Sequence, residues 1–286
     1  MSKNTIHPSG LVPSRFDARD FRLRHDAVFA NDFPDDFALL TPTVKNQGSK
    51  PTCAAHAGST IIEGFYEQEH GKHRVFSTMW IYGIRETGYY LGDGMSLRDV
   101  CNTLHKYGDC YNADLPGNEN VDESVAAVNA KRDELAAAAY PHRITKYFKV
   151  DPSSRADMRR ALMNHGYLLV SMTCREGDYL AHSRIWTTDT ARATTGRHAV
   201  VIYGWCPEGW LVQNSWGAMW GDRGRFVLPY DFKLNEVWGT QDNNPEGEDD
   251  LEEPYDSKFG KFIAKCINAI ASAFYAIKRL FKKTSF

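Results

Sequence analysis

Four polar residues of this 286-residue chain have the types and the spacing of a site for acyl transfer through a cysteine. Cys53 is the candidate nucleophile, and Gln47 stands six residues before it in the run QGSKPTC. His198 opens the apolar run HAVVIYGW, and Asn214 begins the run NSWG sixteen residues later. A nucleophile, a base, a group that orients the base and a donor for an oxyanion are the parts that this chemistry needs.

The position of Cys53 favours the thiolate, which is the nucleophilic form of cysteine. Cys53 follows Pro51 and Thr52, and proline suits the first turn of a helix, so the partial positive charge of a helix N-terminus is expected to lower the pKa of the thiol. An imidazolium from His198 would lower this pKa further. The alternative is a small buried cysteine, which is the usual fate of a lone cysteine but leaves Gln47 and NSWG unexplained.

His198 is one of ten histidines, and most of the ten must be solvated or held by structural hydrogen bonds. It is singled out because an apolar run follows it directly and NSWG comes soon after, which predicts two neighbouring strands of one sheet. Asn214 can then accept a hydrogen bond from the far imidazole nitrogen and fix the tautomer of the ring. Trp216 would cover this hydrogen bond and exclude water, whereas Trp220 is expected only to pack.

The elements that must position these residues change in kind along the chain. Apolar positions recur at helical spacing from Cys53 to a stop at Gly71, and the long alanine-rich run ESVAAVNAKRDELAAAAY has high intrinsic helix propensity. Three serines stand where helix N-caps are expected: Ser77, Ser96 and Ser154. Later runs are short and rich in β-formers: YLLVSMT, HAVVIYGW, GWLVQNS and GRFVLP. We therefore expect the nucleophile in a helical half and the base in a strand half, meeting between two lobes.

These motifs, in this order, resemble those of the papain family of cysteine peptidases over roughly residues 36–235. The resemblance implies an α+β fold with a helical N-terminal lobe, a C-terminal lobe built on an antiparallel β-sheet or barrel, and a cleft between them. It also implies a cysteine endopeptidase in which Gln47 and the N–H of Cys53 stabilise the oxyanion. The pattern is closest to bacterial and viral members that lack a long pro-domain.

The chain departs from the family pattern near the nucleophile and along the cleft. TCA replaces the common Ser-Cys-Trp, and Lys50 stands where secreted relatives carry a cysteine that forms a disulfide. The glycine pair of the non-primed side is present only as GDGM at 92–95. By the resemblance, Met95 and Ala199 would border the pocket for the second residue before the scissile bond, and this pocket would accept an apolar side chain.

Composition excludes several classes of function. The chain has 42% hydrophobic residues, 24% charged residues and a formal net charge of −2, so nucleic acid is not expected as a partner. Six scattered cysteines without CxxC, and no second ligand pair beside Cys53 and His56, predict no metal and no cofactor. No signal peptide or membrane-spanning stretch is seen, so synthesis in the cytoplasm is expected, with non-classical export left open.

The chain divides into four parts on these grounds. Residues 36–240 form the catalytic domain, and residues 1–35 form an extension of mixed charge. The part of this extension around residues 11–25, which contains an Asp-x-Arg-Asp stretch, is expected to lie over or beside the cleft as a lid or short pro-segment; a disordered tail is the alternative. Residues 241–257 carry eight acidic and no basic side chains, which predicts a solvated linker.

Residues 258–286 reverse the charge, with seven lysines and arginines and no acid. Their apolar residues fall on one face at helical spacing: Phe259, Phe262, Ile263, Cys266, Ile267, Ile270, Phe274, Ile277 and Phe281. This pattern predicts an amphipathic helix that lies on an anionic membrane surface or docks on a protein, including its own catalytic domain. The regular apolar stripe argues against a disordered basic tail.

Two functions other than peptide hydrolysis are compatible with the sequence. The first uses the same reactive residues, and the second uses none of them. A deamidase or transpeptidase would differ from a peptidase only in the group that carries or receives the acyl chain. An inactive papain-like fold would serve as a binding module targeted by its C-terminal helix. The intact set of four reactive residues argues against the inactive fold.

Overall fold

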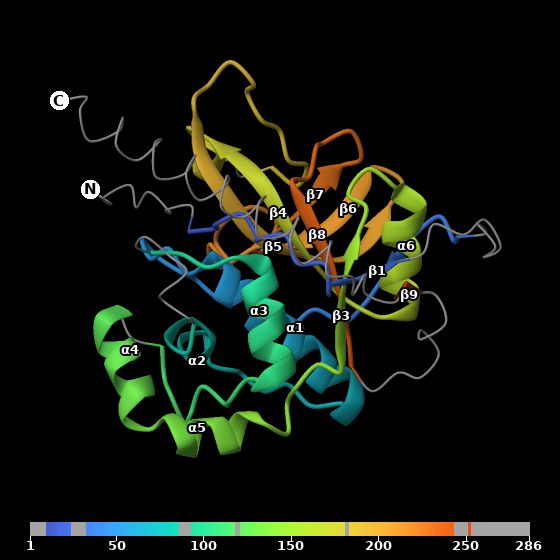
Figure 1. Ribbon diagram of the computed structural model, residues 1–286. Coiled ribbons are helices and arrows are strands. Elements are labelled where there is room, and N and C mark those ends of the chain that lie inside the picture. Colours follow the sequence, from blue (N-terminus) through green and yellow to red (C-terminus); the bar gives the residue numbers. More distant parts are fainter. Residues whose placement is uncertain are drawn as a thin grey trace.

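The computed structural model describes residues 10–23, 33–85, 93–117, 121–180, 183–242 and 251–252. The helices are α1 (Cys53–His70), α2 (Thr78–Gly83), α3 (Leu97–Lys106), α4 (Val121–Ala130), α5 (Arg132–Ala139) and α6 (Arg155–Asn164), with a short 3-10 turn η2 (Asp178–Leu180). The strands are β1 (Phe21–Leu23), β2 (Phe37–Ala38), β3 (Lys146–Val150), β4 (Leu168–Arg175), β5 (Thr194–Cys206), β6 (Gly209–Gln213), β7 (Arg225–Pro229), β8 (Glu236–Gln241) and β9 (Leu251–Glu252). The helices α1 to α5 gather in one lobe and most of the sheet in the other (Figure 1). The expected α+β class is confirmed.

Helix α1 is the central helix, and every residue from Cys53 to Phe65 is buried. Small side chains make this possible: a Cβ added at Gly58 would press on Val100 of α3. The helix ends as the sequence predicts, with Gly71 in the left-handed conformation at φ 61°. Burial on all sides fixes the position of its first turn, and with it the position of the nucleophile candidate.

The three predicted serine N-caps are present. Ser77, Ser96 and Ser154 each accept a hydrogen bond from the backbone N–H three residues further on, at the starts of α2, α3 and α6. At α3 the Ser96 hydroxyl also donates to Asp99 Oδ2 over 2.7 Å. Such a cap contributes about 1 kcal/mol to the stability of its helix.

The alanine-rich run is helical, as its propensity predicts, but it forms two helices. It is divided at Lys131 into α4 and α5. Val128 of α4 packs over Gly83 of α2, whereas Leu135 and Ala139 are the buried residues of α5. The break lies at Lys131, whose φ of −123° and ψ of 24° are not helical, so high helix propensity does not by itself keep the run in one helix.

The sheet follows the order β7-β6-β5-β4-β8-β3-β1-β9, with β2 paired to β5 at its side. Most neighbours are antiparallel as expected, but β1 runs parallel to β3, so the sheet is mixed. Within the described residues no pairing joins β7 to β9, and the sheet is therefore open rather than a closed barrel. Strand β8 was not predicted, although it lies between β4 and β3; its Gly239 faces the ring of Phe148.

Strand β5 contributes to hydrophobic clusters on both faces of the sheet. Ala199 and Val201 belong to the cluster that includes α1, and Val200 and Ile202 belong to the cluster that includes α6. This alternation follows from the two-residue period of a strand. The sheet is thus packed between the helical lobe and α6, and Ala199 and Val201 of β5 face the cluster that includes α1.

Part of the predicted acidic linker is ordered as strand β9, whose Glu252 pairs with Arg22 of β1. Residues 243–250 and the predicted C-terminal helix at 258–286 lie outside the described residues. Among the residues that the structure describes, no helix has both the length and the apolar character needed to cross a membrane.

Candidate active site

The thiol of Cys53 lies at the first turn of α1, against Ala199 of β5. Backbone groups of Ala199 and Gly10 hydrogen-bond to it. Because Ala199 follows His198 in β5, the segment that carries the base candidate lies beside the first turn of α1. Two segments that are distant in the sequence therefore meet as the motif predicts.

The thiol is fully buried in this arrangement, at 0% exposure. Burial raises the pKa of Cys53, and the hydrogen bonds from Ala199 and Gly10 lower it by less. This corrects the sequence-based expectation of a lowered pKa, which considered the helix terminus and the imidazole but not the exclusion of water. A buried thiolate loses its hydration, and that loss is the larger effect here.

The imidazole of His198 is held by two neighbours on the strand side. Its Nε2 lies 2.7 Å from Oδ1 of Asn214, and the ring of Trp216 stacks on it with 4.6 Å between centroids. Asn214 directly follows β6, which pairs with β5, so the predicted neighbouring strands are present. The amide oxygen is an acceptor, so Nε2 is the protonated nitrogen and Nδ1 is the one that must exchange a proton with a thiol.

Gln47 is tied to the segment that contains Asn214. Its backbone N–H donates to the carbonyl of Ser215 over 2.8 Å, and its Oε1 accepts from the Ser215 hydroxyl over 2.7 Å. Its Nε2 donates to the carbonyl of Lys50 over 2.9 Å. An amide NH₂ carries two hydrogens, so this contact does not by itself prevent donation to an oxyanion.

Ser215 links the two sides of the site, a role that was not predicted from the sequence. Besides its bond to Gln47, its backbone N–H donates to Asn214 Oδ1 over 2.8 Å. One residue therefore orients both the oxyanion donor and the group that holds the imidazole. The available signal was its place inside NSWG, where a small polar residue stands between Asn214 and Trp216.

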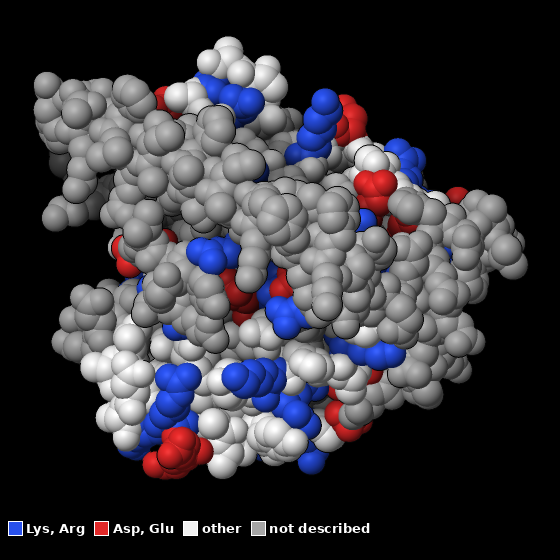
Figure 2. Space-filling view, in the orientation of Figure 1, with Lys and Arg blue, Asp and Glu red and all other residues white. Residues whose placement is uncertain are grey.

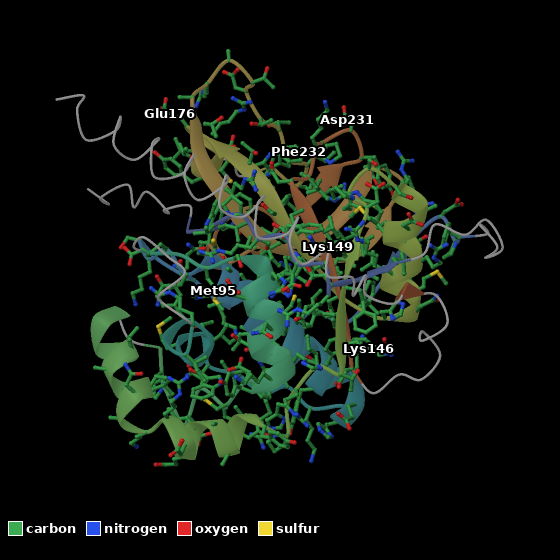
Figure 3. The ribbon with its side chains drawn as sticks, viewed as in Figure 1. Met95, Lys146, Lys149, Glu176, Asp231 and Phe232 are labelled. Carbon is green, nitrogen blue, oxygen red and sulfur yellow. The ribbon has the colours of Figure 1, made fainter. Side chains whose placement is uncertain are left out.

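Met95 and Ala199 are buried at 0% and 1% exposure. Both belong to the same hydrophobic cluster as Leu11 of the N-terminal segment. Met95 lies on the helical lobe, on the side that faces the sheet (Figure 3). The structure thus places the two predicted pocket residues near Cys53, in contact with a cluster that contains an apolar side chain from the chain itself.

Residues 10–12 run across the site between the two lobes. The N–H of Leu11 lies 3.4 Å from the carbonyl of Arg197, on the sheet side. On the helical side, Met95 donates to Gly10 over 3.0 Å and accepts from Val12 over 3.1 Å, so the two segments pair as parallel strands. These contacts explain why Cys53 has no exposed surface.

Glycine is required where this segment approaches the site most closely. A Cβ at Gly10 would collide with the carbonyl oxygen of Pro51, and a Cβ at Gly94 would collide with the carbonyl oxygen of Gly10. Gly94 also has φ 104°, a conformation that side chains disfavour. Gly94 is the second glycine of the GDGM run, which the family resemblance places on the non-primed side of the cleft.

His56 is buried beside the nucleophile but takes a structural role. Its Nδ1 lies 3.0 Å from the carbonyl of Thr52, and burial lowers its pKa to about 3. The ring is therefore neutral at neutral pH and donates to that carbonyl. Within the described part of the chain, no group of three or more His, Cys, Asp or Glu side chains is placed to hold a metal ion.

A model of papain family cysteine proteases matches residues 35–237. The chain belongs to this family. Its curated relatives include cathepsin K of Mus musculus, 24% identical over 197 residues, and ananain of Ananas comosus, 26% identical over 211 residues. These matches cover 66% and 70% of this chain, which spans a little over half of the two relatives, 56% and 55% of their length.

Solved structures of papain family members share the fold. Xylellain, a cysteine protease from Xylella fastidiosa, has a TM-score of 0.71 at 20% identity, covering 85% of this chain and 98% of its own. The bromelain protease from Ananas comosus, solved with the inhibitor E64, has a TM-score of 0.55 at 18% identity and covers 73% of this chain and 100% of its own. At these identities the likeness establishes the fold alone.

Proposed function

We propose that this chain is a cysteine endopeptidase that hydrolyses peptide bonds through a thioester on Cys53. The observation that carries the proposal is the 2.7 Å contact between His198 Nε2 and Asn214 Oδ1, next to Ala199, whose backbone hydrogen-bonds to Cys53. It gives the imidazole the tautomer and orientation that a cysteine nucleophile needs from its base. Membership of a family of cysteine proteases supports the same reaction.

In the proposed reaction the Cys53 sulfur attacks the peptide carbonyl carbon, and its proton passes to His198. The tetrahedral oxyanion is stabilised by the N–H of Cys53 and the amide of Gln47. The imidazolium then protonates the departing amine as the C–N bond breaks, leaving the thioester. His198 next takes a proton from water, which attacks the thioester and releases the acid and the thiol. Asn214 keeps the ring aligned in both steps.

Substrate choice is proposed to depend on an apolar side chain two residues before the scissile bond. The burial of Met95 and Ala199 in one hydrophobic cluster with Leu11 supports this, because the cluster already accepts a leucine. A charged side chain at this place would lose its hydration without gaining a partner. Peptides with Leu at this position are expected to be cleaved better than matched peptides with Glu.

Residues 10–12 are proposed to keep the enzyme latent. Cys53, His198 and Gln47 are exposed by 0%, 1% and 2%, so a substrate has no access while this segment is in place. Its backbone hydrogen bonds to Met95 and Arg197 use groups that an extended peptide substrate would need. Removal or displacement of the segment is the proposed step of activation.

Alkylation by the epoxide E64, which the bromelain protease binds in its solved structure, tests the proposed reaction. The chain lacking residues 1–12 should be labelled at one cysteine, and Cys53→Ala should abolish the labelling. Mass spectrometry of a peptide library after incubation should then show cleaved peptides. Deamidated or ligated peptides without cleavage would reject hydrolysis, and no labelling of either the full or the trimmed chain would reject the enzyme.

The C-terminal segment 258–286 lies outside the described residues, and its role is proposed from its sequence. We propose that its basic, amphipathic pattern places the enzyme on an anionic membrane surface. Co-sedimentation of the full chain with anionic vesicles, but not with neutral vesicles, is the expected result. If the chain is absent from the pellets of both kinds of vesicle, membrane binding is rejected and docking on a protein remains as the role of this segment.

A further inference from the structure

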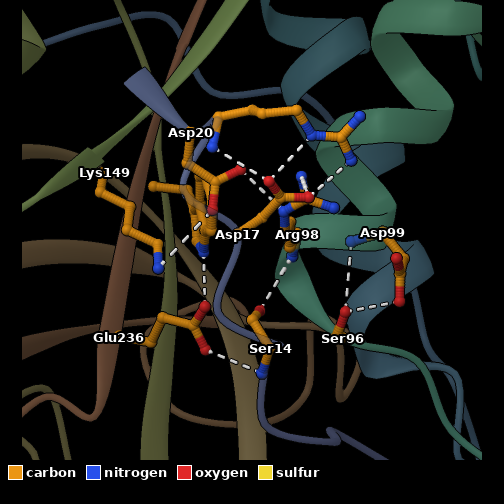
Figure 4. A network of polar contacts seen from close by, with 10 residues as sticks. Ser14, Asp17, Asp20, Ser96, Arg98, Asp99, Lys149 and Glu236 are labelled. Atoms are coloured by element: carbon orange, nitrogen blue, oxygen red, sulfur yellow. Dashed lines mark hydrogen bonds and ion pairs between the residues drawn. The ribbon is translucent and has the colours of Figure 1, made fainter. Parts of the chain in front are cut away.

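A network of charged side chains holds the segment that follows residues 10–12. We call residues 10–20 the strap. Figure 4 shows Asp17 and Asp20 of the strap gathered around Arg98 of α3, with Lys149 of β3 at the side of Asp20. Figure 2 shows blue and red atoms adjoining one another near the centre of the face that it presents. The network therefore lies where the helical lobe, the sheet and the strap meet.

Arg98 contacts both aspartates at hydrogen-bond distance. Its Nε lies 2.7 Å from Asp20 Oδ1 and its Nη2 lies 2.8 Å from Asp17 Oδ2. The planar guanidinium holds its N–H donors at fixed angles and can therefore bind two acceptors at once. An ammonium group has no such fixed geometry. The side chains of Asp20 and Arg98 are exposed by only 2% and 17%, so salt screens this ion pair less than a pair at the surface.

The sheet holds the same stretch from the other side. Lys149 Nζ lies 3.7 Å from Asp20 Oδ2. The N–H of Ser14 is 3.4 Å from Oε2 of Glu236, and the indole of Trp238 fixes the other carboxylate oxygen of Glu236 over 2.6 Å. The strap is thus attached to both lobes, and not only to the helix that carries Arg98.

The start of α3 couples this network to the cleft. Met95, which pairs with Gly10 and Val12, stands three residues before Arg98. The backbone N–H of Arg98 also donates to Ser14 Oγ over 3.1 Å, which satisfies one of the N–H groups that a helix start leaves without a partner in the helix. The stretch from Met95 to Arg98 therefore holds the strap by backbone pairing at one end and by charge at the other.

We propose that the contacts of Arg98 with Asp17 and Asp20 form a latch that keeps residues 10–12 over Cys53, and that breaking the latch opens the site. The proposal rests on the proposed peptidase and names the regulation of its site. The Asp-x-Arg-Asp stretch supplies the latch with its two acids, and its Arg19 orients the first of them, because Arg19 Nη2 lies 2.7 Å from Asp17 Oδ2. Activation then requires loss of the latch or cleavage between the latch and the cleft.

The test is the rate at which E64 alkylates Cys53 in the full-length chain. Arg98→Met keeps much of the side-chain volume and removes both contacts, and Asp20→Asn is nearly isosteric and removes one charge. Both variants should be labelled at least about tenfold faster than the wild type, since truncating one partner of a buried charge pair shifts an equilibrium by that much or more. Asp20→Asn keeps the test decisive if Arg98→Met does not fold.

A matched control separates opening of the strap from general loss of stability. Arg160 and Asp157 form another buried pair, at 2.8 Å, within α6. Arg160→Met should lower the Tm without faster labelling of Cys53. Equally fast labelling of this control would overturn the latch, because unfolding alone would then explain the effect.

The chain lacking residues 1–12 distinguishes the latch from the proposed function. Fast labelling of this chain, together with wild-type rates for full-length Arg98→Met and Asp20→Asn, would overturn the latch and leave the peptidase standing. If the trimmed chain is not labelled, Cys53 is not a reactive thiol. The proposed peptidase is then rejected, and the latch proposal, which rests on it, is rejected as well. Fast labelling of the trimmed chain and of both latch variants is the expected result.

Discussion

His198 and Asn214 are joined by a 2.7 Å contact that lies under the ring of Trp216. Asn214 is exposed by only 4%, so water competes little for this hydrogen bond. The imidazole is therefore held in one tautomer before any substrate arrives. Such positioning lowers the entropic cost of the reaction, because the base needs no reorientation.

Asn214→Ala should lower kcat by about 10²-fold, within the range that general acid–base catalysis contributes. The ring of His198 would lose its acceptor at Nε2 and would populate other orientations. Steady-state kinetics on the chain lacking residues 1–12 measure the effect. Asn235→Ala is the control, at an asparagine that stands directly before β8 and accepts a hydrogen bond from Thr173 of β4. An unchanged kcat for Asn214→Ala would contradict the assigned role.

Gln47→Ala should lower kcat by about 10²–10³-fold with little change in KM, because the amide would act mainly on the oxyanion of the transition state. Ser215→Ala should lower kcat by a smaller factor, since this change removes the 2.7 Å hydrogen bond that orients the Gln47 side chain. Measurement of kcat and KM separately distinguishes these effects. A rise in KM alone would place Gln47 in ground-state binding instead.

His56 should make the stability of the protein depend on pH. Burial lowers its folded pKa to about 3, so its contribution to stability is complete above the unfolded pKa and is lost as pH falls toward the folded value. With an unfolded pKa of about 6.5, the loss between pH 8 and pH 5 is about 2 kcal/mol. Urea unfolding of wild type and His56→Gln at both pH values measures it. An identical pH dependence of the two proteins would refute this titration.

Gly10→Ala should speed the labelling of Cys53 by E64 in the full-length chain. The added methyl group would collide with the backbone of Pro51, which cannot move away as a flexible side chain does. Gly117→Ala is the matched control, because no atom lies within 4 Å of a Cβ at that position. If Gly10→Ala is labelled at the wild-type rate, the cover of residues 10–12 over the thiol does not depend on the close contact of Gly10 with Pro51.

The parts of the fold that the sequence predicted depend on local interactions. The serine caps act within four residues, and the stop of α1 needs only the left-handed conformation of Gly71. The runs that became β4 to β7 were recognised by their apolar, β-branched residues. By contrast, β8 carries a glycine and mixed polarity, and only its place between β4 and β3 makes it a strand.

The residues proposed to carry the chemistry, Gln47, Cys53, His198 and Asn214, could be named from the sequence because reactive residue types stand in short motifs. The burial of the thiol could not be, because it follows from how the two lobes pack. The pKa of Cys53 is raised because packing between lobes and the passage of residues 10–12 remove water, and no local pattern reports that burial. Likewise the attachment of the strap at Arg98 joins residues far apart in the chain, which only folding brings within hydrogen-bond distance.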